Sequence, residues 1–177
     1  LANWTFITMS SELRVDRIVP VDGVASDSGA NRYGGGIIQI LQHTDSTQYT
    51  TSSTSYQQGP QTPTFTLKKS TSKVRVIANY MIYADARSSG YLTCRCALYR
   101  GSVASGTRIT QGSQPIMYES GGGVEYYRAF CTLSFLDAPG GNTTYSLAFL
   151  KNNSDGSNPY ILGTQMQTVI TLEEYSA

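Results

Sequence analysis

The sequence predicts an all-β protein, a jelly-roll β-sandwich of about eight or nine antiparallel strands with an extended N-terminal arm. Three observations predict this fold. Apolar residues alternate with polar ones in several runs, which is the period-two pattern of strands. Segments rich in Gly, Ser, Thr, Asn and Pro separate these runs at short spacing. No segment carries the apolar repeat of an amphipathic helix. The 177 residues suffice for one domain with a sizeable core.

We expect two parts, an N-terminal arm with a Gly-rich linker over residues 1–35 and the sandwich domain over residues 36–177. The linker sequence VDGVASDSGANRYGGG has the Gly, Ser, Asp and Asn content of a flexible connection. Apolar side chains in such an arm suit the surface of a partner. The candidate anchor residues are Trp4, Phe6, Ile7, Leu13 and Val15.

The run at 73–83, KVRVIANYMIY, is expected to be a central strand of the core. The even-numbered residues carry no charge, whereas the odd-numbered residues are a mixture of apolar, polar and charged ones. Successive side chains of a strand point to opposite faces, so we expect one face to be buried and the other to be partly exposed. A second alternating run, YLTCRCALYR at 91–100, follows a short turn-rich segment. Two alternating runs joined by a short loop predict a β-hairpin.

The remaining strands follow from the same alternation, with turn residues between them. They are expected at 13–19, 37–42, 64–68, 115–118, 125–136, 143–150, 160–162 and 165–174. The segment 43–63 is rich in Ser, Thr, Gln and Tyr and has little periodicity. It is interpreted as a long surface loop or a weakly formed outer strand. The segment 101–114 is interpreted as a Gly-rich turn region.

Charge and hydropathy exclude two classes of partner. Charged residues make up 14% of the chain, against about 25% in an average soluble domain, and the net charge is +1. Such a chain has no long-range field to attract nucleic acid or an anionic membrane. No apolar stretch approaches the roughly 20 residues that span a bilayer. We therefore expect neither nucleic-acid binding nor membrane insertion.

The residue types of metal and nucleophile chemistry are sparse. Cys94 and Cys96 lie two apart on one strand face, which is poor disulfide geometry, and either could reach Cys131 if its strand lies opposite. All three are interpreted as small buried hydrophobic residues. The single His43 lies far from them in sequence, so a zinc site is not indicated. We expect no metal, no cofactor and no catalytic residues.

Acidic residues do not indicate a catalytic pair. Asp85, Asp137 and Asp155 lie in turn sequences, where such residues usually form Asx-turns. A hydrolase acting on polysaccharide would need two positioned carboxylates, and nothing in the sequence singles out a pair.

The 13 tyrosines indicate contact surfaces, because tyrosine is amphipathic and loses little entropy on binding. The candidate subunit interface combines the odd-numbered residues of 73–83 with the tyrosines of the next predicted strand, 91–100. Its residues are Ile77, Met81, Tyr83, Tyr91 and Tyr99. Two Ser- and Gly-rich loops form the candidate receptor surface. Its residues are Tyr49, Tyr56 and Arg108.

The order of motifs resembles a family of bacteriophage virion proteins. SSELRVDRIVPVDG resembles the opening of many structural proteins of marine phages, cyanophages among them. GGGIIQILQ, TPTFTLKKSTSKVRV, YLTCRCALYRGS, FLDAPGGNTTYSLAF and TVITLEEY then follow in a similar order. The resemblance covers residues 10–175. It implies a jelly roll similar to the trimeric heads of C1q and tumour necrosis factor, a homotrimer, and no enzyme activity.

The expected function is therefore that of a phage virion structural protein, a trimeric fibre, knob or decoration protein located on the virion. Its partners would be two further copies of itself and other virion proteins reached through the N-terminal arm. The alternative is a receptor- or glycan-binding module at the tip of a tail fibre.

Overall fold

The chain folds as an all-β protein in a computed structural model, which describes residues 36–86, 90–92, 94–113, 117–119, 125–152, 160–161 and 166–175. The predicted arm at 1–35 and the predicted strand at 13–19 lie outside the described residues. In chain order the strands are β1 (Ile37–Asp45), β2 (Tyr49–Thr50), β3 (Gln57–Gln61), β4 (Lys73–Ala86), β5 (Gly90–Leu92), β6 (Cys94–Arg100), β7 (Thr107–Ser113), β8 (Met117–Glu119), β9 (Glu125–Asp137), β10 (Tyr145–Lys151), β11 (Tyr160–Ile161) and β12 (Thr168–Tyr175).

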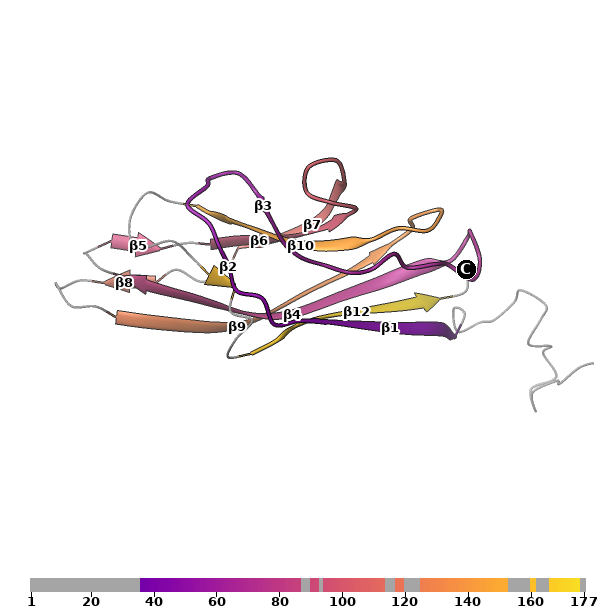
Figure 1. The fold of residues 1–177 in the computed structure, drawn as a ribbon, viewed down its shortest axis with the longest axis horizontal. Helices are drawn as coiled ribbons and strands as arrows, with labels where there is room; N and C mark the ends of the chain where they lie inside the picture. Colours follow the sequence, from indigo (N-terminus) through magenta and orange to yellow (C-terminus); the bar gives the residue numbers. More distant parts are fainter. Residues whose placement is uncertain are drawn as a thin grey trace, which may run out of the picture. The chain divides into compact units, whose positions relative to one another are not determined.

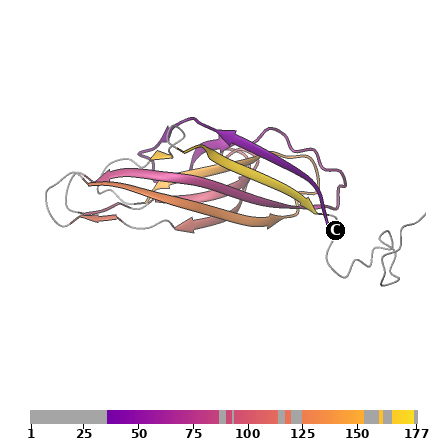
Figure 2. The same cartoon turned by 90° about the horizontal axis from the view of Figure 1, so that it is seen from below.

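The strands form two main sheets that lie in two layers (Figure 1). Sheet A has the order β1-β12-β4-β9, and the short β11 and β2 continue it beside β4. Figure 2 shows the four long strands of sheet A side by side. Sheet B has the order β3-β10-β6-β7, and β5 pairs with β8 as a separate ribbon. All strand pairs are antiparallel, for example β4 with β9 and β10 with β6.

The strand order confirms the predicted jelly roll. The strands of five residues or more among those described are β1, β3, β4, β6, β7, β9, β10 and β12. Counted first to eighth in that order, sheet A runs 1-8-3-6 and sheet B runs 2-7-4-5. This is the jelly-roll arrangement, in which the chain crosses between the two sheets so that few neighbours in sequence are neighbours in a sheet.

The core lies between the two sheets, and β4 contributes to it the alternate residues that the sequence predicted. On β4 the uncharged parity is buried, from Val74 to Ile82, and the alternate Arg75 is exposed. Residues of sheet B close the other side of the core, among them Leu98, Leu147 and Phe149. Burial of apolar surface at about 25 cal/mol per Å² is the main stabilising contribution to such a core.

The predicted hairpin between 73–83 and 91–100 is wrong. β4 pairs with β12 and β9 in sheet A, whereas β6 pairs with β10 and β7 in sheet B. Alternation predicts which residues are buried in each strand, but it carries no information about the partner strand. The two apolar faces therefore meet across the core and do not lie side by side.

Two further segments differ from expectation. The region 101–114 contains a strand, β7. The region 43–63 contains the end of β1, so that His43 lies in a strand, and it contains β2 and β3 at the ends of the sheets, which agrees with the outer-strand alternative. Conversely, 64–68 forms only a bridge between Phe65 and Thr143. These strands are rich in Thr, Gln, Ser and Gly, whose weak hydropathy hides the alternation. No helix in the described part of the chain is long and apolar enough to span a membrane.

Asp137 joins the two sheets, which corrects its interpretation as a turn residue. It is the last residue of β9 and is buried. One carboxylate oxygen accepts a hydrogen bond from Nη2 of Arg100 at 2.9 Å, and the other accepts from the Tyr145 hydroxyl at 2.9 Å. Arg100 and Tyr145 belong to sheet B, so a single carboxylate ties sheet A to β6 and β10. The Asp85 side chain and Asp155 lie outside what the structure describes.

The three cysteines are buried, as predicted, and they are free thiols. The Sγ atoms of Cys94 and Cys96 are 4.0 Å apart, inside the core. Burial raises the pKa of the Cys96 thiol well above its usual range and raises the pKa of Cys131 to about 11. Thiolate formation is therefore suppressed, and these residues contribute packing.

Glu174 on β12 is a second buried carboxylate with a structural function. It accepts hydrogen bonds from the backbone amides of Lys68 and Lys69 and from the Gln39 side chain. Burial alone would raise its pKa, but the hydrogen bonds outweigh burial and hold the pKa below its ordinary value of 4.5. The carboxylate thus fixes the segment before β4 against β12 of sheet A.

We expect Glu174→Gln to lower the free energy of unfolding at pH 7 by about 1–3 kcal/mol, because an amide group would face backbone donors. A depressed pKa stabilises the fold above the unfolded value and loses that contribution as pH falls through the folded value. The difference between wild type and variant should therefore shrink below about pH 4.5. Urea unfolding at pH 7 and pH 3 measures this difference.

Glu173→Gln is the matched control for this experiment. The Glu173 carboxylate lies 3.9 Å from the half-exposed guanidinium of Arg75 and accepts a hydrogen bond from the Tyr175 hydroxyl at 2.7 Å. A glutamine oxygen can still accept that hydrogen bond, so the substitution removes only the exposed ion pair and should change stability by less than about 1 kcal/mol. If both substitutions lowered the free energy of unfolding equally, the specific stabilising function that we assign to the Glu174 carboxylate would be contradicted.

Candidate ligand pocket on the outer face of sheet B

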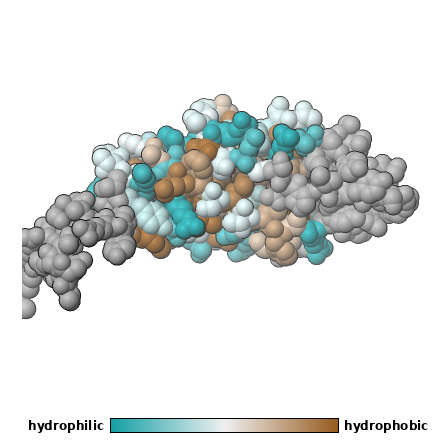
Figure 3. Space-filling model, turned by 180° about the vertical axis from the view of Figure 1, so that it is seen from behind, coloured by the Kyte–Doolittle hydropathy of each residue, from teal (hydrophilic) through white to brown (hydrophobic). Residues whose placement is uncertain are grey.

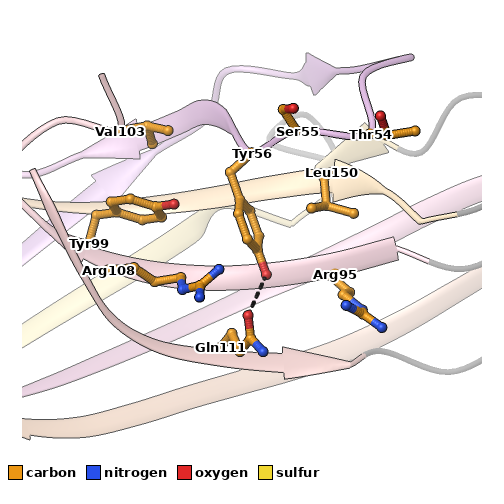
Figure 4. A pocket seen from close by; sticks show the side chains of 9 residues that line it. All are labelled: Thr54, Ser55, Tyr56, Arg95, Tyr99, Val103, Arg108, Gln111 and Leu150. Atoms are coloured by element: carbon orange, nitrogen blue, oxygen red, sulfur yellow. Dashed lines mark hydrogen bonds between the residues drawn. The ribbon is translucent and has the colours of Figure 1, made fainter. Parts of the chain in front are cut away.

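A pocket of about 460 Å³ opens on the outer face of sheet B, away from the core. The segment before β3, the strands β6 and β7 with their connecting turn, and β10 contribute its walls (Figure 4). Its lining residues are Thr54, Ser55, Tyr56, Arg95, Tyr99, Val103, Arg108, Gln111 and Leu150. The volume falls in the range of about 300–1,000 Å³ that is typical of small-ligand sites.

Strand alternation explains which side chains reach the pocket. Leu98 and Cys96 of β6 point into the core, so Arg95 and Tyr99 point to the opposite face. Arg108 is the cross-strand partner of Tyr99, and cross-strand partners share a face. Sequence reasoning passed over Arg95, Gln111 and Leu150. Arg95 alternates with core residues of β6, so its position on the outer face could have been predicted from the sequence.

Tyr56 is the centre of the pocket. Its ring makes an edge contact with Tyr99 at 6.0 Å between centroids, and the Arg108 guanidinium lies 5.5 Å from the Tyr56 centroid. The Tyr56 hydroxyl donates to Gln111 Oε1 at 3.3 Å, the dashed line in Figure 4. Burial raises the pKa of the Tyr56 phenol, against an opposing effect of Arg108, so the phenol is neutral near pH 7.

Backbone turns hold the walls in place. The turn between β6 and β7 needs glycine at Gly106, because a Cβ there would collide with the carbonyl oxygens of Arg100 and Ser102. The amide of Val103 in that turn donates to the Gln58 side chain at 2.8 Å. This bond ties the β6–β7 turn to β3, so the two walls that carry Arg108 and Tyr56 are connected.

The pocket is positively charged. Arg95 and Arg108 are both exposed, and no acidic residue is among the lining side chains. Within the described ranges neither arginine has a carboxylate within ion-pair distance. Two guanidinium groups without carboxylate partners can accept an anionic group through charge-assisted hydrogen bonds.

The predicted receptor residues come together in part. Tyr56 and Arg108, from separate loops, are in contact in the pocket. Tyr49 lies on β2 beside sheet A, where its hydroxyl donates to Asp45 at 2.8 Å. Whether any of the three contacts a receptor stays a prediction.

The predicted subunit interface does not form one surface. Tyr99 lines the pocket on sheet B, while Ile77 and Tyr83 lie on the outer face of sheet A. Met81 is 3% exposed and therefore packs within the chain. The side chain of Tyr91 lies outside the description. The wrong hairpin explains the error, because it placed β4 and β6 in one sheet.

The candidate anchor residues cannot be placed. Trp4, Phe6, Ile7, Leu13 and Val15 precede the described ranges, so the structure does not test them. In the described part of the chain, no group of three or more His, Cys, Asp or Glu side chains is arranged to hold a metal ion.

The outer face of sheet A carries large exposed apolar side chains. Ile40 on β1 is 60% exposed, and Phe130 and Leu136 on β9 are 73% and 52% exposed. Ile40 and Leu136 lie in one cross-strand row through Glu173 and Arg75. Figure 3, which views the two layers from the side, shows brown side chains interspersed with teal and white ones there.

The fold and the pocket define the chain as an all-β jelly-roll protein with a positively charged, aromatic pocket on one outer face. No known protein family and no curated protein sequence match it. Among solved structures it is similar, for example, to chains of three infectious bursal disease virus particles.

The three similarities are distant. The T13 viral particle has 13% identity and a TM-score of 0.32, with 81% of this chain and 36% of that chain covered. The T=1 particles have 13% identity and a TM-score of 0.30, with 78% and 36% covered. The Gx strain has 11% identity and a TM-score of 0.32, with 92% and 46% covered. The chain thus spans less than half the length of these chains.

Proposed function

We propose that the chain is a structural protein of a phage virion, a trimeric fibre, knob or decoration protein located on the particle. The jelly-roll strand order agrees with the fold that the motif order implied. The N-terminal segment 1–35 is the attachment arm that docks on other virion proteins. The sandwich forms the trimer. No step of this function requires catalysis.

The exposed apolar residues on the outer face of sheet A carry this proposal. Phe130 is 73% exposed, and Ile40 and Leu136 are more than half exposed. These side chains share one face, with Glu173 and Arg75 between Ile40 and Leu136, so the contact that we assign to them is a mixed apolar and polar one. The chain has few charges overall, which suits contacts between identical copies. We assign this face to contact with a second copy of the chain.

Comparison of the full chain with a variant that lacks residues 1–35 tests the division of labour. We expect both proteins to have three times the mass of one chain at micromolar concentration in light scattering. Only the full chain, and not the truncated variant, should bind to virus particles from which this protein has been removed. A monomeric full chain would refute the trimer. A truncated chain that still attaches would refute the function of the arm.

The pocket favours a second function, a receptor- or glycan-binding module at the tip of a fibre. Tyr56, Tyr99 and Arg108 form an exposed polar and aromatic site on sheet B. Tyrosine and arginine are enriched where proteins bind their partners. A fibre knob can combine this activity with trimer formation, because the two surfaces lie on different sheets.

A further inference from the structure

We propose that the pocket around Tyr56 binds acidic saccharides whose charge is a carboxylate, such as chains that contain uronic acid. The inference rests on the second proposed function, glycan binding, and names the class of glycan. Arg95 and Arg108 would hold the carboxylate, and the tyrosines would contact the sugar ring.

The arginines carry the argument for an anion. The pocket combines two guanidinium groups with no acidic lining residue, although the whole chain has 13 basic and 12 acidic residues. Both groups are on strands of sheet B, which is a rigid support. A planar guanidinium matches the two oxygens of a carboxylate, so bidentate binding is available.

The preorganisation of Arg108 strengthens this argument. Its guanidinium lies over the Tyr56 ring, 5.5 Å from the centroid, so its position is restricted before a ligand arrives. In the view of Figure 4, Tyr56 lies between Arg108 and Arg95, and both arginine heads are near the same opening. Little side-chain entropy then remains to be lost on binding.

The other lining groups favour a sugar as the carrier of the charge. Thr54, Ser55, Gln111 and the two tyrosines offer hydroxyl and amide groups that can hydrogen-bond sugar hydroxyls. Leu150 and the tyrosine rings add an apolar surface for the carbon face of a ring. Thr54, Ser55, Arg95, Arg108 and Gln111 are all exposed, so the site is accessible to a chain on a larger surface.

Titration calorimetry of the full chain tests the proposal with three oligosaccharides of equal length. The first is an oligogalacturonate, the second is its carboxyl-reduced neutral counterpart, and the third is a sulfated oligogalactan. We expect the oligogalacturonate to bind, and its neutral counterpart to bind at least about tenfold more weakly, the loss expected when one charge-assisted contact is removed. The sulfated oligogalactan should also bind more weakly, because its anionic group is held away from the sugar ring by an ester oxygen, whereas the carboxylate carbon of a uronate is attached to the ring directly. Its affinity should fall with added NaCl.

Variants locate the site. Arg95→Gln and Arg108→Gln should each weaken oligogalacturonate binding about tenfold or more without changing the melting temperature, since both side chains are exposed. Arg75→Gln is the matched control, because Arg75 is an exposed arginine on sheet A. It should bind as the wild type does.

Each contrary result overturns a defined part of the proposal. If the neutral oligosaccharide binds and the acidic one does not, glycan binding stands and the acidic class is wrong. If the sulfated chain binds equally well, the site recognises charge and not a carboxylate. If no oligosaccharide binds, both the glycan function and this inference fail, and the virion proposal is unaffected. If Arg75→Gln weakens binding as much as Arg108→Gln, the pocket is not the site.

Discussion

Replacing Asp137 by alanine should lower the free energy of unfolding by about 3 kcal/mol, the low end of the 3–5 kcal/mol seen when one partner of a buried ion pair is removed. The low end applies because a third of the Arg100 side chain remains exposed. The change would leave Arg100 and the Tyr145 hydroxyl without their shared acceptor. At about 2–4 °C per kcal/mol, the melting temperature should fall by roughly 6–12 °C.

Two companion variants separate the contributions at this site. Tyr145→Phe removes one neutral donor and should cost about 1–3 kcal/mol, and Arg100→Gln removes the charge partner. A double-mutant cycle of Asp137→Asn with Arg100→Gln should give a coupling energy well above zero, because the two side chains are in contact. Additive effects would mean that the ion pair does not link the sheets energetically.

Replacing Phe130 by aspartate should dissociate the proposed trimer while leaving the subunit folded. The Phe130 side chain is 73% exposed in the single chain, so the substitution should change subunit stability by about 0.5 kcal/mol or less. A buried aromatic residue at an interface commonly contributes 2 kcal/mol or more, which corresponds to roughly thirtyfold in affinity. Ile40→Asp should act in the same direction from the opposite edge of the sheet.

The measurement is the mass of the complex by analytical ultracentrifugation over a concentration series, with circular dichroism to confirm folding. Thr107→Asp is the control, because Thr107 is exposed on β7 of sheet B and gains the same charge. A Phe130→Asp variant that remains trimeric would remove the outer face of sheet A from the interface. Dissociation by Thr107→Asp would move the interface to sheet B.

The jelly-roll order makes the two proposed functions separable. Sheet A carries the exposed apolar residues, and sheet B carries the pocket, so no residue belongs to both surfaces. Variants at Phe130 should therefore leave oligogalacturonate binding by each subunit unchanged. Variants at Arg108 should leave the proposed trimer intact. Cross effects would indicate that binding and assembly are coupled.

The alternation in the sequence predicted the burial of individual residues well. The uncharged alternate residues of β4, including Val76 and Tyr80, are buried as predicted, whereas β10 was predicted only as a strand and is buried at every residue. These assignments need only local information, since adjacent side chains of a strand point to opposite faces. The same reasoning predicted the three buried cysteines.

The alternation in the sequence could not predict which strands pair or which residues form the pocket. A hairpin between 73–83 and 91–100 was predicted because the two segments are close in sequence, but the jelly roll places those strands in opposite sheets. Asp137 was interpreted as a turn residue because its partners, Arg100 and Tyr145, come from the other sheet. The Gly- and Thr-rich strand β7 was missed because its alternation is weak.

The sequence by itself determined the fold class, the inward face of β4 and the choice of Tyr56 and Arg108 as residues of interest. These properties follow from period-two hydropathy and from residue chemistry, which are local. Only the tertiary structure decided that Tyr56, Arg95, Tyr99 and Arg108 surround one pocket. Their proximity arises from pairing between strands that are distant in sequence, and side-chain periodicity does not encode that pairing.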